Sequence, residues 1–216
     1  MIAFANMLAA SVHILRREAK SVFEHAEQSI LMAEEHTFDF IKLGSLAWYG
    51  WALVELGEQE KGISKIKKSI EIALALASRR PQGLPHILAY LGEAHLKVGL
   101  IQEALEVVEK ALQIVKETRE NWYKAELYRL KGEILYLQAN PEAQSFFIKA
   151  IEIAHRQEAK SWELRASTSL ARLLAKQGKK EEALRVLKPV YHWFSEGFDT
   201  ADLKDAKLLL VKLSEE

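Results

Sequence analysis

The chain has 216 residues, of which 49% are apolar and 28% charged, so it can bury a continuous core beneath a hydrophilic surface. Its 30 Lys and Arg residues balance its 30 Asp and Glu residues, which excludes a global basic field of the kind that attracts nucleic acid or an anionic membrane. The chain has no cysteine, which excludes a disulfide framework and thiolate chemistry. We expect a cytoplasmic protein that binds neither nucleic acid nor membrane.

The first segment of the chain is an apolar run from Met1 to Ala10. A signal peptide carries positive charge before such a run, whereas Arg16 and Arg17 follow it here. The run is interrupted by Asn6 and is shorter than the ~20 residues needed to cross a bilayer. We therefore expect a buried helix. Because it is apolar on most sides, we also expect that further repeats precede Met1 and that this helix supports self-association.

A helical hairpin recurs along the chain, and its clearest copy runs from Leu88 to Ala111, LAYLGEAHLKVGLIQEALEVVEKA. Two helices turn back at Gly99, and Gly92 and Ala104 are small where the helices must approach. The small residues that open each second helix, at spacings of 43, 42, 39 and 40, are Ala19, Gly62, Ala104, Ala143 and Ala183. The large apolar residues four positions later are Phe23, Ile66, Val108, Phe147 and Leu187. This periodicity is typical of a tetratricopeptide (TPR) array, in which hairpins stack to bury their apolar faces.

The repeat boundaries follow from loop and capping residues. Two prolines and a glycine place a loop over Arg79–Pro85. Asn121 and Ser161 are good N-cap residues for the fourth and fifth repeats. The five repeats run over about 1–36, 38–80, 84–119, 121–158 and 161–196, and a capping helix covers 199–214. The sequence therefore predicts a single all-α domain over 1–216, a right-handed TPR-like α-solenoid of about five helix pairs plus a C-terminal capping helix.

Three segments resemble the C-terminal end of a large bacterial signalling family. They are ELYRLKGEIL (126–135), AQSFFIKAIEIAHRQEAKSWELRASTSLARLLAKQGKKEEA (143–183) and PVYHWFSEGFDTADLKDAKLLL (189–210). Members of that family join a class III adenylate/guanylate cyclase or a DNA-binding domain to a STAND-type ATPase and a long TPR array. The resemblance is close over 122–210 and looser over 1–121. It implies that any enzymatic domain lies upstream of Met1.

The residues themselves provide no catalytic or metal-binding motif. The segment from Gly57 to Ser64 has Ile63 where a phosphate-binding loop requires lysine, and a helix rather than a strand precedes it. The seven histidines lack a metal-ligand spacing, and the serines of 161–169 lack a Gly-x-Ser-x-Gly elbow. We expect no enzymatic activity, no cofactor and no metal in this chain.

The expected functional surface is the concave groove lined by the first helix of each pair. Aromatic and arginine side chains frequently anchor interfaces. The groove residues predicted from the repeat register are Trp48, Trp51, Glu55, His86, Tyr90, Glu93, Lys97, Arg129, Glu133, Tyr136, Arg165, Arg172 and Lys176. The set changes from aromatic to basic toward the C-terminus, which favours a protein or peptide ligand with an acidic end.

The predicted function is that of a non-catalytic sensor or scaffold that binds a protein, peptide or inducer and restrains an upstream ATPase or cyclase domain. Two alternatives remain open. One is the effector-sensing TPR domain of a transcription activator, and the other is a free-standing TPR adaptor.

Overall fold

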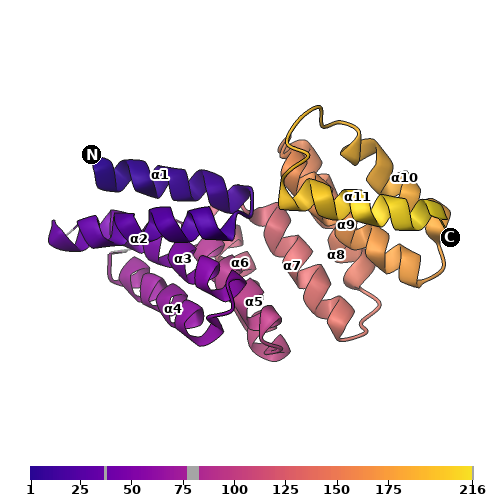
Figure 1. Ribbon diagram of the computed structural model, residues 1–216. Coiled ribbons are helices and arrows are strands. Elements are labelled where there is room, and N and C mark those ends of the chain that lie inside the picture. Colours follow the sequence, from indigo (N-terminus) through magenta and orange to yellow (C-terminus); the bar gives the residue numbers. More distant parts are fainter. Residues whose placement is uncertain (37, 77–82, 216) are drawn as a thin grey trace. The chain divides into compact units, whose positions relative to one another are not determined.

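The computed structural model describes residues 1–36, 38–76 and 83–215, and this part of the chain contains eleven helices and no strand (Figure 1). The helices are α1 (Ile2–Leu15), α2 (Ala19–Glu35), α3 (Asp39–Glu55), α4 (Gln59–Leu76), α5 (Leu84–Lys97), α6 (Ile101–Thr118), α7 (Lys124–Leu137), α8 (Ala143–Arg156), α9 (Lys160–Lys176), α10 (Lys180–Tyr191) and α11 (Ala201–Glu215). The predicted all-α class, with five helix pairs and a terminal helix, is confirmed.

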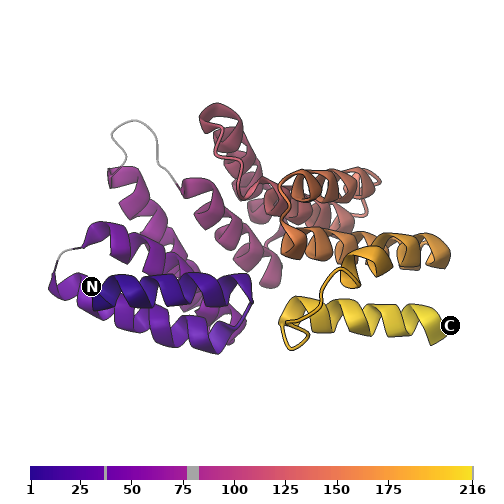
Figure 2. The same ribbon diagram turned by 90° about the horizontal axis from the view of Figure 1, so that it is seen from above.

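The helices form two compact units, residues 1–120 and residues 121–216. In the first unit α1, α3 and α5 are neighbours, α2 packs against α3, and α4 packs against α5. In the second unit α7, α9 and α11 are neighbours, with α8 and α10 as second helices. Figure 2 shows α1, in indigo, at the outer side of its unit. The expectation of one domain over 1–216 stays a prediction.

Small residues lie where the two helices of a pair cross. A Cβ atom added to Gly92 would lie 2.7 Å from Cγ2 of Val108, and one added to Gly132 would lie 2.5 Å from the ring of Phe147. Both distances are shorter than close-packed side chains allow. Each first helix therefore needs a small residue opposite the large residue of its second helix, as the periodicity predicts.

The predicted alignment of the first repeat is wrong by three residues. Ser29 donates a hydrogen bond from Oγ to the carbonyl of Ala3, and Ser69 donates one to the carbonyl of Leu43. In both cases the acceptor lies 26 positions before the donor. Ser29 is therefore equivalent to Ser69, and the residue that opens the packed face of α2 is the fully buried Val22 rather than Ala19. Alanines recur every seven residues along α2, so the spacing alone is satisfied by either register.

The turn between the two helices has the same conformation in all five pairs. One residue in each turn has a positive φ, between 54° and 97°, and these residues are Arg17, Gly57, Gly99, Ala139 and Gly178. The next residue donates its N–H to a carbonyl five positions earlier, as Leu100 does to His95 at 2.9 Å. This is the Schellman arrangement, which satisfies the last carbonyls of the first helix. Arg17 and Ala139 adopt it despite their Cβ atoms.

The predicted N-caps of the fourth and fifth repeats are wrong, because α7 begins at Lys124 and α9 begins at Lys160. The carbonyl of Asn121 accepts hydrogen bonds from the N–H of Lys124 and the side chain of Gln157, so Asn121 lies in a turn before the helix. Ser161 lies inside the first turn of α9. Short polar side chains are frequent in turns as well as at N-caps, which explains the error.

Other predicted boundaries change by a few residues. Leu84 and Pro85, expected in a loop, begin α5, where proline is tolerated because its missing N–H would be unpaired. The helix α10 ends at Tyr191, before the predicted end of the fifth repeat at residue 196. Residues 77–82, which hold positions 79–82 of the predicted loop and the expected end of the second repeat, lie outside the described residues.

Candidate functional site

Four of the predicted groove residues in the first unit form one network around Arg17. The guanidinium of Arg17 lies 2.6 Å from a carboxylate oxygen of Glu93 and 3.9 Å from one of Glu55. It also lies 5.3 Å from the centre of the Trp51 ring, and the indole N–H of Trp51 donates to Glu93 at 3.1 Å. Lys97 pairs with Glu55 at 2.9 Å. The network holds α3 and α5 to the turn that precedes α2.

The aromatic residues predicted in this unit are mostly packed inside it. Trp51 is 2% exposed and Tyr90 is 4% exposed, while Trp48 is half-buried. His86 packs edge-on against Tyr90 with ring centres 5.9 Å apart. Burial lowers the pKa of His86 to about 4, so its imidazole is neutral at pH 7. The structure therefore leaves the charged residues and Trp48, rather than Trp51 or Tyr90, accessible to a partner.

A buried ion-pair network links the three first helices of the second unit. Glu126 is 2% exposed and lies 2.7 Å from Arg129 and 3.2 Å from Arg165. Arg129 also pairs with Glu133 at 3.2 Å, and Arg165 pairs with Asp202 of α11 at 3.6 Å. The charges of Arg129 and Arg165, expected to face an acidic ligand, are thus balanced by carboxylates inside the unit. Their role in the structure is to join α7, α9 and α11.

Four other predicted residues line a groove between the same helices, which we call the first-helix groove. Its volume is about 390 Å³. The lining side chains come from α7 (Glu133, Tyr136), α9 (Ser169, Arg172, Ala175, Lys176) and α11 (Asp205, Leu208, Leu209, Lys212, Leu213). The structure thus brings together Glu133, Tyr136, Arg172 and Lys176, which sequence reasoning placed on one surface.

The polar side chains of the first-helix groove differ in how well they are paired. Ser169 donates to Glu133 at 2.5 Å, and Nη2 of Arg172 donates to both carboxylate oxygens of Asp205. The ammonium of Lys176 lies 4.8 Å from the centre of the Tyr136 ring. The Tyr136 hydroxyl is buried and has no hydrogen-bond partner among the residues that the structure describes. A buried unpaired hydroxyl is costly.

The contribution of α11 to this groove was missed, because the terminal helix was read as a cap. Its buried residues Leu203 and Leu213 lie 39 positions after the buried Leu164 and Leu174 of α9. This repeat spacing marks α11 as a first helix, and extending the alignment past the fifth repeat would have found it.

Arg17 was missed for another reason, since it lies in a turn and contacts Glu93, a residue 76 positions away.

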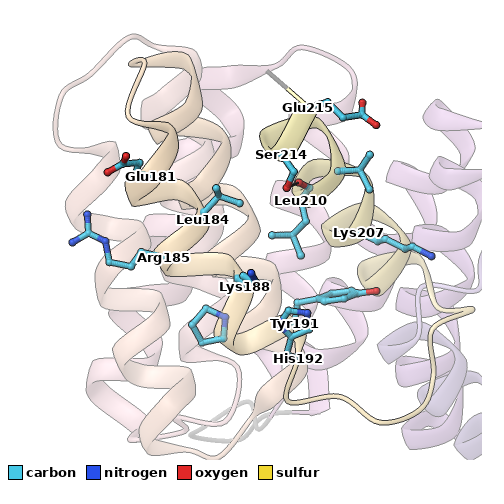
Figure 3. Close-up of a pocket in the computed structure, with 12 residues that line it drawn as sticks. Glu181, Leu184, Arg185, Lys188, Tyr191, His192, Lys207, Leu210, Ser214 and Glu215 are labelled. Carbon is cyan, nitrogen blue, oxygen red and sulfur yellow. Dashed lines mark hydrogen bonds between the residues drawn. The ribbon is translucent and has the colours of Figure 1, made fainter.

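A second groove, which we call the end groove, lies between α10 and α11 (Figure 3). Its volume is about 930 Å³, in the range of ligand-binding clefts. The apolar side chains that line it are Leu184, Pro189 and Tyr191 from α10 and Leu210 and Val211 from α11. No residue of the end groove was predicted as a site.

The described part of the chain holds neither a metal-binding cluster nor a membrane-spanning helix. Within residues 1–36, 38–76 and 83–215, no three histidine, aspartate or glutamate side chains are grouped so that they could hold a metal ion. Over the same residues, no helix is both long and apolar enough to cross a membrane. The candidate sites in the described part of the chain are therefore its surface grooves.

Comparison with known proteins supports the repeat assignment. A family model described as a tetratricopeptide repeat matches residues 164–189, which cover most of α9 and part of α10. No protein among the curated ones matches the chain. The helical hairpins, their crossing residues and this match together define an all-α, TPR-like solenoid.

Solved structures share this fold at low sequence identity. PlcR of Bacillus thuringiensis, solved in complex with the peptide PapR7 and DNA, aligns with a TM-score of 0.74 and 15% identity over 98% of this chain and 70% of its own. A Rap protein complexed with Competence and Sporulation Factor aligns with a TM-score of 0.66 and 12% identity over 99% of this chain and 64% of its own. BtubC from P. vanneervenii aligns with a TM-score of 0.63 and 16% identity over 99% of this chain and 90% of its own. At these identities the likeness shows the fold alone.

Proposed function

We propose that the chain is a non-catalytic regulatory module that binds a peptide or an extended protein segment in the first-helix groove. The observation that carries the proposal is the arrangement of that groove. It combines an apolar wall, with Leu208 71% exposed, and the polar groups of Tyr136, Arg172 and Lys176 on three neighbouring helices. Apolar surface with a few polar groups is the usual composition of a binding cleft.

The charges of the groove favour a ligand with an acidic group. Glu133 is already bonded to Arg129 and Ser169. Lys176 and Lys212 form no ion pair with any residue in the described part of the chain. A ligand carboxylate near these lysines would gain charge-assisted hydrogen bonds. Structures of PlcR with the peptide PapR7 and of Rap with Competence and Sporulation Factor are consistent with ligand binding by this fold.

The larger context of the module is also part of the proposal. The resemblance of 122–210 to the cyclase and ATPase family favours a cytoplasmic sensor or scaffold that restrains an upstream catalytic domain. The alignment with 70% of PlcR, whose structure contains DNA, favours the alternative of an effector-sensing domain in a transcription activator. A reading frame upstream of Met1 that encodes a cyclase or ATPase supports the first, and a helix-turn-helix supports the second. An independent promoter supports a free-standing adaptor.

Self-association through α1 is a separate part of the proposal. A stripe of exposed apolar side chains runs along the helix at positions 4, 8, 12 and 15, and Phe4 and Val12 belong to it. The opposite stripe, which includes Met7 and Ala10, is buried against the rest of the first unit. A continuous apolar stripe on a surface helix is a frequent contact site between protein chains.

A peptide-selection experiment tests binding in the first-helix groove. The probe is a library of seven-residue peptides, prepared once with a free C-terminal carboxylate and once amidated. We expect the purified chain to enrich a subset of the carboxylate library, and we expect a Lys176→Glu/Lys212→Glu variant to lose that enrichment. Arg129→Gln is unsuitable as a test because Arg129 belongs to the buried ion network. Equal enrichment by the wild type and the double variant would contradict the proposal.

A further inference from the structure

We propose that the end groove between α10 and α11 binds an amphipathic helix of a partner protein. The helix would pack on α11 as the second helix of each pair packs on its first helix. This surface is separate from the first-helix groove, so the two proposals can fail independently.

The repeat register identifies the side of α11 on which the partner helix would pack. Because α11 repeats α9 at a spacing of 39, Leu210 of α11 is equivalent to Ala171 of α9. Ala171 is fully buried in the second unit, where α10 packs beside α9. No second helix in the described part of the chain packs on the equivalent side of α11, where Leu210 lines the end groove (Figure 3). A helix bound there would continue the packing pattern of the array.

The floor of the end groove can bury an apolar helix stripe. Leu184 and Tyr191 line it from α10, and Leu210 and Val211 line it from α11. Val211 remains 45% exposed. Burial of such side chains provides the main driving force for helix binding in a groove, and anchors spaced by three and four residues would meet them.

The charges along the groove define the direction of the bound helix. Figure 3 shows Glu181 and Glu215 at one end of the groove and Lys188 and Lys207 toward the other, because α10 and α11 run in opposite directions. Neither lysine forms an ion pair with a residue that the structure describes. A helix N-terminus is favoured near carboxylates and a C-terminus near cations. The partner helix should therefore run antiparallel to α11, as the second helix does in the other pairs, with acidic side chains near its C-terminus.

The side chain at the crossing position restricts which helices fit. In the third and fourth pairs a glycine of the first helix faces the large side chains of Val108 and Phe147. In α11 the large residue is Leu210, so the volume that a large partner residue would fill is already occupied. The partner helix must carry a small residue at the equivalent position.

The chain contains a helix with all of these features, and it provides a probe. A peptide with the sequence of residues 19–35, AKSVFEHAEQSILMAEE, has Lys20 near its N-terminus, Glu34 and Glu35 at its C-terminus and Ala26 at the position equivalent to Phe147. The peptide is acetylated, amidated and labelled with fluorescein, and its anisotropy is measured as the purified chain is added. The matched control peptide carries Ala26→Phe.

We expect saturable binding of the Ala26 peptide and at least about fivefold weaker binding of the control. Val211→Glu in the chain should weaken binding at least about tenfold, and Lys188→Glu/Lys207→Glu should weaken it and reduce its salt dependence. Leu208→Glu, on the same helix but in the first-helix groove, should leave it unchanged. Circular dichroism melting confirms that each variant folds, since the substituted side chains are partly exposed.

Three results would overturn the proposal. They are the absence of saturable peptide binding up to about 0.5 mM chain, undiminished binding to the Val211→Glu variant, and equal affinity for the two peptides. If the peptide fails to bind and Val211→Glu instead abolishes self-association in sedimentation, the occupant is a second copy of the chain. That outcome also excludes a partner helix.

Discussion

Gly50 and Gly62 face each other so closely that neither position has room for a methyl group. A Cβ atom on Gly50 would lie 2.6 Å from the carbonyl oxygen of Gly62, and one on Gly62 would lie 2.5 Å from the carbonyl oxygen of Gly50. Since both obstacles are backbone atoms, no side-chain rotation can relieve them. A methyl group added at this crossing of α3 and α4 therefore tests the helix packing directly.

We expect Gly50→Ala to lower the free energy of unfolding by about 1–3 kcal/mol, because the helices must separate. The higher helix propensity of alanine, about 1 kcal/mol, offsets only part of this loss. Gly44→Ala in the same helix is the matched control, since its nearest neighbours lie 3.6 Å from the new Cβ atom. It should be neutral or stabilising. Urea denaturation measures both, and equal stabilities of the two variants would contradict the packing at this crossing.

The left-handed turn residues provide a test of backbone strain. Ala139→Gly should raise the free energy of unfolding by about 1 kcal/mol, because alanine is strained at its φ of 54°. The reverse change, Gly178→Ala, should lower it by a similar amount, and no atom lies within 4 Å of the new Cβ. Thermal or urea unfolding of the pair measures the effect. Changes of the same sign would show that contacts rather than φ determine stability at these turns.

Loss of a charge from the buried Glu126 network of the second unit should destabilise the fold far more than loss of the exposed ion pair between Arg172 and Asp205. Glu126→Gln leaves the guanidinium groups of Arg129 and Arg165 without their shared carboxylate, so we expect a loss of about 3 kcal/mol. Arg172→Gln, which breaks the exposed pair with Asp205, should cost less than about 1 kcal/mol. Urea denaturation of both variants is the measurement, and similar losses would contradict the assigned difference in burial.

The neutral His86 should make the fold less stable in acid. Burial lowers the pKa of His86 to about 4, whereas the unfolded chain takes up its proton near pH 6.5. The contribution of neutral His86 to the free energy of unfolding is therefore complete above about pH 6.5. It is lost as the pH falls toward 4, by at most about 1.4 kcal/mol per pH unit. Unfolding free energies at pH 7, 6 and 5 measure the slope. His86→Gln should flatten it, and an unchanged slope would assign the effect to other groups.

The exposed stripe of α1 should determine whether the first unit associates with a second chain. We expect Leu8→Glu/Val12→Glu to sediment as a monomer at concentrations where the wild-type chain associates, because charged side chains replace apolar contact surface. The matched control is Leu31→Glu, which changes an exposed residue of α2. A wild-type chain that remains monomeric at high concentration would argue against contact through α1.

The sequence by itself determined the helical hairpins, because small residues at crossings and large residues four positions later are a local, periodic requirement. It also located Glu133, Tyr136, Arg172 and Lys176 on one surface, since positions in register repeat along first helices. The register of the first repeat was ambiguous in sequence, because alanines recur at the helical spacing. The hydrogen bond from Ser29 to Ala3 and the burial of Val22 decided it.

Only the tertiary structure showed which side chains of the predicted site are accessible. Arg129 and Arg165 read as free cations in sequence, but both lie beside Glu126, whose burial depends on the packing of three helices. Arg17 contacts a carboxylate 76 positions away, which no local pattern encodes. The end groove likewise requires α10 and α11 to be placed in space. Periodicity is a property of neighbouring residues and can be read along the chain, whereas pairing and exposure depend on which distant residues meet.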